Sequence, residues 1–113
     1  MSEFVFLYRG GQRASDAAES DKVMQKWVAW MEDLGSKGHL KDRGQPLDPG
    51  GKVVRGKYKQ VTDGPYAEAK DVVGGYIIVD TPDLAHAVDL SKGCPILEVG
   101  GSVEVRPVQK LSM

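Results

Sequence analysis

The chain of 113 residues has little of what several kinds of protein site require. Its single cysteine cannot form a disulfide within the chain, so nothing points to an oxidising compartment. Its two histidines are far apart and, with the cysteine, match no metal-ligand spacing, so we expect no metal. A formal net charge of -1 leaves no global field to attract nucleic acid or an anionic membrane.

Long apolar runs and phosphate-binding loops are also lacking. No stretch is long enough to cross a bilayer, and residues 1–10 have the pattern of a strand rather than of a signal peptide. The glycine pairs lack the lysine and the spacing of a phosphate loop, so we expect no cofactor. We therefore expect a cytoplasmic protein with one domain, residues 1–113.

The first half of the chain predicts a strand, a helix and a hairpin. The apolar run from Phe4 to Tyr8 is typical of a strand covered on both faces. Asp16 is a helix cap, and Gly38 is the expected stop. Residues 40–47 and 52–58 flank a turn cluster, which predicts a hairpin. One wide apolar stripe follows the helix, formed by Val23, Met24, Trp27, Val28, Met31 and Leu34.

The second half predicts a strand, a helix and a strand. Residues 72–80 form a second buried strand, and Thr81, followed by Pro82, is the expected cap of a second helix. Residues 102–106 alternate polar residues with valine, and Pro107 places this last strand at a sheet edge. This order is the split βαβ pattern of α+β, ferredoxin-like folds, in which two helices cover one face of an antiparallel sheet.

Alternation along the strands predicts which residues share a face of the sheet. We expect the helices to cover Val5, Leu7, Ile77, Val79, Val103 and Val105. The other face would then carry Phe4, Phe6, Tyr8, Tyr76, Ile78, Glu104 and Arg106. That face is too apolar for water and the chain has no further element to cover it, so a homodimer is the simplest cover.

Charged and phenolic groups gather in the segment that leads into the second buried strand. Asp63 is a candidate general acid or base if a cleft desolvates it, and otherwise a turn aspartate that accepts backbone N–H bonds. Tyr66 either lines a pocket or plugs the loop. Glu68 and Lys70 either pair with each other or reach an anionic ligand.

Four further residues are candidates for ligand binding. Tyr8 has a polar tip that needs a partner from protein or ligand, and Trp27 is either core or a stacking surface. Glu104 and Arg106 either pair with each other or point into a wet cleft against a second copy. In an enzyme, Arg106 and Lys70 would orient an organic anion.

The remaining reactive residue types are expected to be structural. We expect His39 at the surface and His86 solvated on the second helix. Cys94 has no cationic neighbour in the sequence and is expected to be a packed thiol.

The segment from Asp63 to Lys70, DGPYAEAK, resembles the DGPF-type branch of the YCII-related family, with Tyr66 in place of the usual phenylalanine. The resemblance runs nearly end to end and includes residues 44–47, 74–76, 94–95 and 103–107. It implies a ferredoxin-like subunit in a dimeric α+β barrel. Relatives in the wider superfamily act on small cyclic or aromatic acids as lyases or isomerases, and some DGPF-type proteins occur alongside sigma factors.

The YCII-type branch also implies a histidine–aspartate pair whose histidine lies on the first helix. The predicted first helix here has no histidine, and Trp27 lies near the corresponding place. Two functions follow. The chain is a homodimeric enzyme with acid–base chemistry on a small organic or aromatic acid, or it is a non-catalytic module that senses a ligand or docks a protein in a regulatory context. The missing histidine favours the second.

Overall fold

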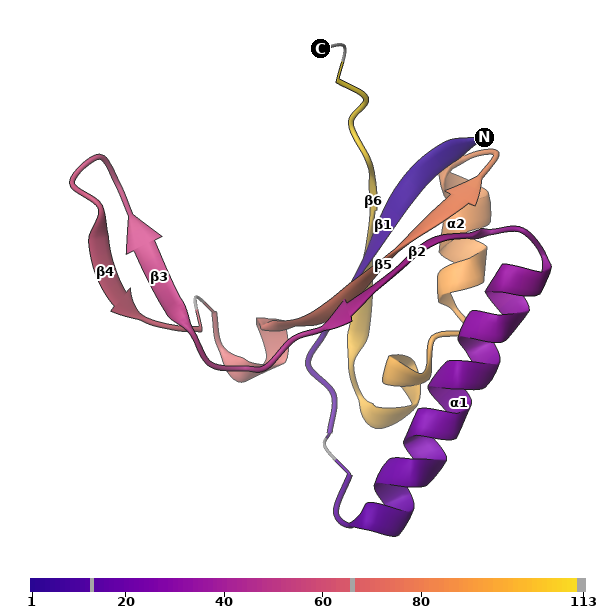
Figure 1. Ribbon diagram of the computed structural model, residues 1–113, viewed down its shortest axis with the longest axis horizontal. Coiled ribbons are helices and arrows are strands. Elements are labelled where there is room, and N and C mark those ends of the chain that lie inside the picture. The colour runs from indigo at the N-terminus through magenta and orange to yellow at the C-terminus, as the bar shows by residue number, and fades with distance from the viewer. Residues whose placement is uncertain (13, 66, 112–113) are drawn as a thin grey trace.

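The computed structural model describes residues 1–12, 14–65 and 67–111. The described residues form six strands, two α-helices and two short 3-10 helices (Figure 1). In chain order they are β1 (Ser2–Arg9), α1 (Ala17–Ser36), β2 (Leu40–Pro46), β3 (Lys52–Arg55), β4 (Gln60–Asp63), η1 (Ala69–Asp71), β5 (Val73–Thr81), α2 (Leu84–Ser91), η2 (Pro95–Val99) and β6 (Ser102–Pro107).

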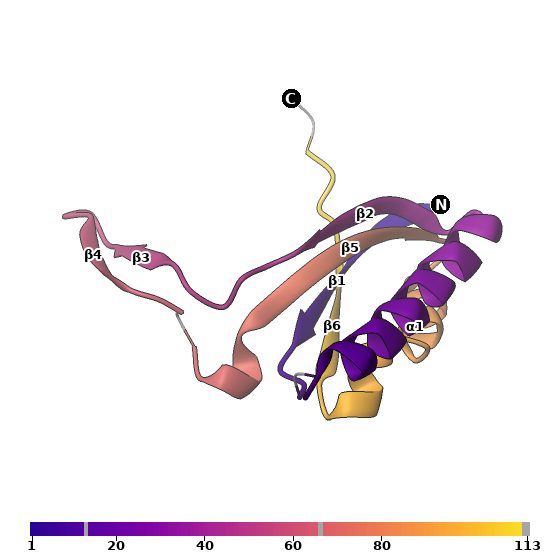
Figure 2. The same ribbon diagram turned by 60° about the horizontal axis from the view of Figure 1, so that its bottom comes forward.

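The main sheet confirms the predicted fold class. Four strands pair in the order β2-β5-β1-β6, and every pairing is antiparallel. Helices α1 and α2 lie on one face of this sheet, and no helix of the described residues lies over the other face (Figure 2). Together these strands and helices form the split βαβ arrangement of a ferredoxin-like fold. The edge position predicted for the last strand is also confirmed.

Local capping explains where both helices begin. Asp16 Oδ1 accepts from the Glu19 N–H at 2.8 Å, as predicted. The Glu19 carboxylate accepts in turn from the Ser15 N–H and hydroxyl, and these bonds lower the Glu19 pKa. The predicted cap of α2 was wrong: Asp83 Oδ1 accepts from the His86 N–H at 2.9 Å, because Thr81 is still part of β5 and is buried there.

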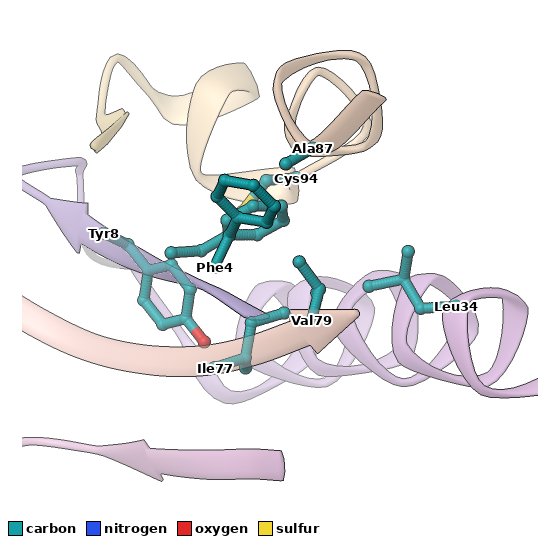
Figure 3. Packing of buried hydrophobic residues seen from close by; sticks show 8 residues of the cluster. Phe4, Tyr8, Leu34, Ile77, Val79, Ala87 and Cys94 are labelled. Atoms are coloured by element: carbon teal, nitrogen blue, oxygen red, sulfur yellow. The ribbon is translucent and has the colours of Figure 1, made fainter. Parts of the chain in front are cut away.

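The buried core corrects the predicted faces of β1. The register pairs Phe4 with Val79 and Phe6 with Ile77, and all four belong to the buried core on the helix-covered face. Figure 3 shows Phe4, Ile77 and Val79 within this core. Tyr8 lies on this face too, opposite Gly75. The prediction failed because β1 is apolar at consecutive positions, so the sequence did not show which alternate residues face the helices. Packing against α1 sets the orientation of the strand, since the Phe6 ring stacks on the Trp30 ring with 6.3 Å between their centroids.

The open face of the sheet is still apolar at its centre. Val5 pairs with Ile78 and Leu7 with Tyr76, and all four are half-buried. Their position corrects the prediction for Val5 and Leu7 and confirms it for Tyr76 and Ile78. Arg106 and Glu104 of β6 pair with Val5 and Leu7, so they lie on the same face, as predicted.

The predicted hairpin was assigned to the wrong strands. Strand β2 pairs with β5, whereas β3 pairs with β4 in a separate two-stranded sheet. We call β3, β4 and the turn between them the arm, residues 52–63; it projects from the end of the main sheet (Figure 1). The radius of gyration is 15.7 Å, against about 13 Å for a compact chain of about this length. None of the described helices is long and apolar enough to span a membrane.

Candidate functional site

An apolar cleft of about 330 Å³ lies on the helix-covered side of the sheet, between α1 and the ends of three strands. This volume is at the lower end of the range for small-molecule pockets. Its lining is formed by Tyr8, Gly10, Met24, Trp27, Met31, Arg43, Gln45, Pro46, Gly74 and Ile96. The cleft brings together two of the residues predicted from the sequence, Tyr8 and Trp27. It lies on the opposite face from the cleft that the sequence predicted.

Tyr8 presents a polar group to this cleft. Its side chain is 8% exposed, and within the described structure no residue hydrogen-bonds to its hydroxyl. Burial, with a smaller contribution from Cys94, raises the Tyr8 pKa. The phenol is therefore protonated at neutral pH and is a hydrogen-bond donor rather than a base.

Aromatic packing fixes the wall around Tyr8. The Tyr8 ring meets the Trp27 ring edge to face, with 4.8 Å between their centroids. Trp27 in turn meets Trp30 at 5.9 Å. Gly75 leaves room for the phenol, since a Cβ atom there would lie 2.8 Å from Tyr8 Cε2. The cleft wall is thus built from rings held by the core.

Helix α1 supplies the other apolar wall. Trp27 and Met31 are half-buried and pack on the core, as the predicted stripe requires. Met24 and Val28, predicted in the same stripe, are exposed. Met24 lines the cleft instead of the core. The stripe is wider than the sheet beneath it, and its uncovered margin forms part of the site.

Strand β2 supplies Arg43, the only charged residue among the described residues of the lining. The pairing of β2 with β5 shifts between Asp42, opposite Ile78, and Gln45, opposite Tyr76, so β2 has one extra residue here. The sequence predicted neither this bulge nor a role for Arg43 in a site. The signal was Gly44, a glycine inside a predicted strand, which is typical of a bulge.

The residues of the arm and of η1 lie outside the cleft. Asp63 ends β4, its side chain is 86% exposed, and it forms an ion pair with Lys52. Glu68 and Lys70 are exposed, and no ion pair joins them in the described part of the chain. Tyr66 lies outside the described residues. The assigned roles of these side chains stay predictions.

The two candidates on β6 lie on the open face of the sheet. Glu104 Oε1 accepts from Arg9 Nη2 at 2.8 Å, which corrects the predicted alternative of a Glu104–Arg106 pair. Arg9 Nη1 also donates to the Asp71 carbonyl at 2.6 Å. Arg106 is exposed and has no partner among the described residues. Tyr8 and Arg106 are therefore on opposite sides of the sheet.

The histidines and the cysteine lie away from the cleft lining. His39 and His86 are half-buried and meet edge to face at 5.0 Å, and His39 Nδ1 lies 3.0 Å from the Asp80 carbonyl oxygen. Both side chains are partly exposed, and the contact between them was not part of the prediction of a surface His39 and a solvated His86. Cys94 is buried, as predicted, and burial raises the pKa of its thiol to about 11.

The chemistry available in the cleft is limited by this lining. Among the described residues that form it, only Tyr8 and Arg43 are titratable, and both are protonated at neutral pH. None of the described lining residues carries a carboxylate or an imidazole. It can enclose an apolar ring and donate hydrogen bonds to it.

Comparisons with known proteins agree with the fold. The YCII-related domain matches residues 3–112. A similar solved structure is 5-chloro-2-hydroxyhydroquinone dehydrochlorinase (TftG) from Burkholderia phenoliruptrix AC1100, in complex with 2,5-dihydroxybenzoquinone. It is 16% identical, covers 95% of this chain and 93% of its own, and gives a TM-score of 0.52. A comparison with curated proteins gives no match.

Proposed function

The chain belongs to the YCII-related family, and we propose that it binds a small planar organic molecule in the cleft between α1 and the sheet. We further propose that it does so as a homodimer, and as a ligand-sensing module rather than as an acid–base enzyme.

The unpartnered hydroxyl of Tyr8 in an apolar cleft carries the proposal. No fully buried side-chain polar atom of the described residues lacks a partner, so this unpartnered hydroxyl is reached by solvent and is open to a ligand that accepts its hydrogen bond. Trp27 offers a ring surface beside it, and Met24 and Met31 offer flexible, polarisable contacts. This combination suits a flat ring that carries at least one oxygen.

The titratable side chains of the described lining favour binding over acid–base catalysis. An acid–base lyase or isomerase needs a group that accepts a proton near neutral pH. Tyr8 is no such base because its pKa is raised, and an arginine is always charged. The described lining has Trp27 on the helix where the family resemblance implies a histidine.

Acid–base catalysis is the second candidate function. The solved structure with a similar fold is a dehydrochlorinase, and its bound molecule is a small oxygenated ring. In this chain Asp63 would have to act on a ligand from the exposed arm, and through a second copy if the arm reaches one. Loss of turnover in an Asp63→Ala variant that keeps its fold would support this candidate.

The homodimer is supported by the open face of the sheet. Its centre is apolar and no helix in the described part of the chain covers it, although burying each such side chain gains roughly 1.5–3 kcal/mol. A second copy related by a two-fold axis would bury this face against itself. The arm is likewise exposed at Val54 (64%), Tyr58 (85%) and Val61 (60%), which fits a chain that packs against another.

An NMR titration tests the proposed site. Protein with ¹³C-labelled methionine methyls and ¹⁵N-labelled indoles is titrated with 4-hydroxybenzoate or 2,5-dihydroxybenzoquinone. We expect shifts at Met24, Met31 and the Trp27 indole, whereas the exposed Met1 is unmoved. Trp27→Ala should abolish these shifts, and Val28→Ala, the control on the next position of α1, should keep them. Shifts confined to Met1, or none at millimolar concentration, would contradict the proposal.

A further inference from the structure

We infer that Arg43 determines the specificity of this cleft, and that the molecule bound is an anion, a planar ring that carries a carboxylate or an ionised hydroxyl. The inference rests on the proposed function and names the substrate class of that same site.

The charge of Arg43 is not neutralised within the described structure. Arg43 forms no ion pair or hydrogen bond with another described residue, and the lining contributes no acid. Asp42, its neighbour in the sequence, is already engaged, since its Oδ1 accepts from the Gly44 N–H at 2.8 Å. By contrast, Arg9 on the open face is paired with Glu104. Arg43 is exposed to solvent where it lines the cleft, and its five donors, without a partner among the described residues, are suited to an anionic oxygen.

The backbone around Arg43 is built to place it there. The extra residue of β2 interrupts the alternation of side chains, so Arg43 departs from the faces set by Asp42 and Gln45. Gly44 has φ of +60°, and a Cβ atom on it would lie 1.7 Å from the Tyr76 carbonyl oxygen. Only glycine fits this close approach of β2 to β5. The Asp42–Gly44 hydrogen bond holds the bulge from the other side.

The second polar group of the cleft acts in the same sense. Tyr8 stays protonated and can donate a hydrogen bond, as can the guanidinium of Arg43. The Tyr8 hydroxyl can also accept one, and Gln45, another residue of the lining, pairs with Tyr76 of the open face. A ring with an anionic oxygen matches this donor-rich, apolar lining better than a neutral ring does. The sequence predicted that Arg106 and Lys70 would bind an anion, but neither residue lines this cleft.

The test compares an acid with its neutral amide. Dissociation constants for 4-hydroxybenzoate and 4-hydroxybenzamide are measured by calorimetry on the wild type, Arg43→Gln, Arg43→Lys and the control Lys41→Gln, an exposed cation of the same strand. We expect Arg43→Gln to weaken binding of the acid about 10- to 100-fold, the range for a charged hydrogen bond, and to leave the amide unchanged. Arg43→Lys should keep part of the affinity, and Lys41→Gln all of it.

Two further measurements complete the test. Raising the salt concentration should weaken binding of the acid and leave binding of the amide unchanged, as expected of an ion pair. The same variants measured with 2,5-dihydroxybenzoquinone, whose acidic groups lie on the ring, distinguish a ring oxygen from a carboxylate as the partner of Arg43. The ligand whose affinity falls more in Arg43→Gln, 4-hydroxybenzoate or 2,5-dihydroxybenzoquinone, carries the anionic group that the guanidinium binds.

Two results would overturn the inference, and they differ. Equal affinity for acid and amide, unchanged in Arg43→Gln but lost in Trp27→Ala, would show that the cleft binds rings and that Arg43 does not select anions. Binding of the acid that Trp27→Ala leaves unchanged would contradict the proposed function itself, and with it the role of Arg43.

Discussion

Tyr8 and Trp27 meet edge to face in the wall of the cleft, with 4.8 Å between their ring centroids. The two residues come from different layers, since Tyr8 lies on β1 and Trp27 on α1. The contact therefore joins the sheet to the helix at the place where we propose that the ligand binds. Removing either side chain has a different expected effect.

Tyr8→Phe should separate binding from stability. The ring and its contact with Trp27 remain, and only the hydroxyl is lost. Because that hydroxyl has no partner among the described residues, we expect the free energy of unfolding to change by less than about 1 kcal/mol. Affinity for 4-hydroxybenzoate should fall about 10-fold. Urea unfolding and calorimetry measure the two quantities, and unchanged affinity in a folded variant would show that the hydroxyl does not contact the ligand.

Two buried groups predict a loss of stability at high pH. Burial raises the Cys94 pKa from 9.0 to about 11 and also raises that of Tyr8 above 10.0. A group whose pKa is raised in the folded state stabilises it fully below the unfolded pKa, and this contribution is lost as pH rises. The free energy of unfolding should therefore fall above pH 9, by up to about 3 kcal/mol for the thiol.

Urea unfolding at pH 8 to 11 checks this dependence. Cys94→Ala should flatten the fall that begins near pH 9, and Tyr8→Phe should flatten only the part above pH 10. A wild-type profile that both variants reproduce would show that neither group is responsible.

Gly44→Ala should be far more destabilising than Gly38→Ala. Both glycines have positive φ, +60° and +76°, so both substitutions strain the backbone by roughly 1–2 kcal/mol. Only at Gly44 does a Cβ atom also meet a carbonyl oxygen, at 1.7 Å, whereas nothing lies within 4 Å of one at Gly38. Thermal unfolding of both variants compares them, and equal losses would contradict the close approach of β2 to β5.

The open face predicts how the chain associates. Leu7→Glu places a charge at the apolar centre of this face, and we expect it to shift a dimer to monomers, since an unpaired buried charge is costly. Val28→Glu, on an exposed position of α1, is the matched control and should leave the dimer intact. Light scattering over micromolar concentrations measures both, and a monomeric wild type would refute the homodimer.

Asp63→Ala distinguishes the two candidate functions. Asp63 and Lys52 are exposed partners, and such ion pairs contribute about 0–1 kcal/mol, so we expect little change in melting temperature. We also expect unchanged affinity for 4-hydroxybenzoate, as for the exposed control Asp48→Ala. A loss of turnover confined to Asp63→Ala would favour the enzyme, whereas a loss of affinity alone would place the arm at the binding site.

Local signals were sufficient for much of the fold. Asp16 and Gly38 bound α1 because capping and a left-handed stop depend on a few neighbouring residues. Pro107 placed β6 at the edge because a missing donor is visible in the sequence. The faces of β1 were not predictable in this way, because Phe4 to Tyr8 are apolar at every position.

Site residues were predictable from the sequence only where the chemical character of the residue itself indicated a role. Tyr8, near the end of a buried strand, and Trp27, on the apolar stripe of α1, were recognisable as amphipathic aromatic residues. Arg43 was not, because its place depends on a bulge that shifts the pairing of β2 with β5. The arm was missed for a related reason: the turn cluster at residues 48–51 marks where the chain leaves the main sheet, and the hairpin turn lies further on, between Arg55 and Gln60.

A crystal structure of the protein soaked in 4-hydroxybenzoate tests the proposed binding site most directly. We predict that the ring lies in the cleft against Trp27 and Met24, with one oxygen about 2.6–3.2 Å from the Tyr8 hydroxyl and the carboxylate on Arg43. A ligand bound at Arg106 on the open face or beside Asp63 on the arm, with the cleft empty, would contradict it.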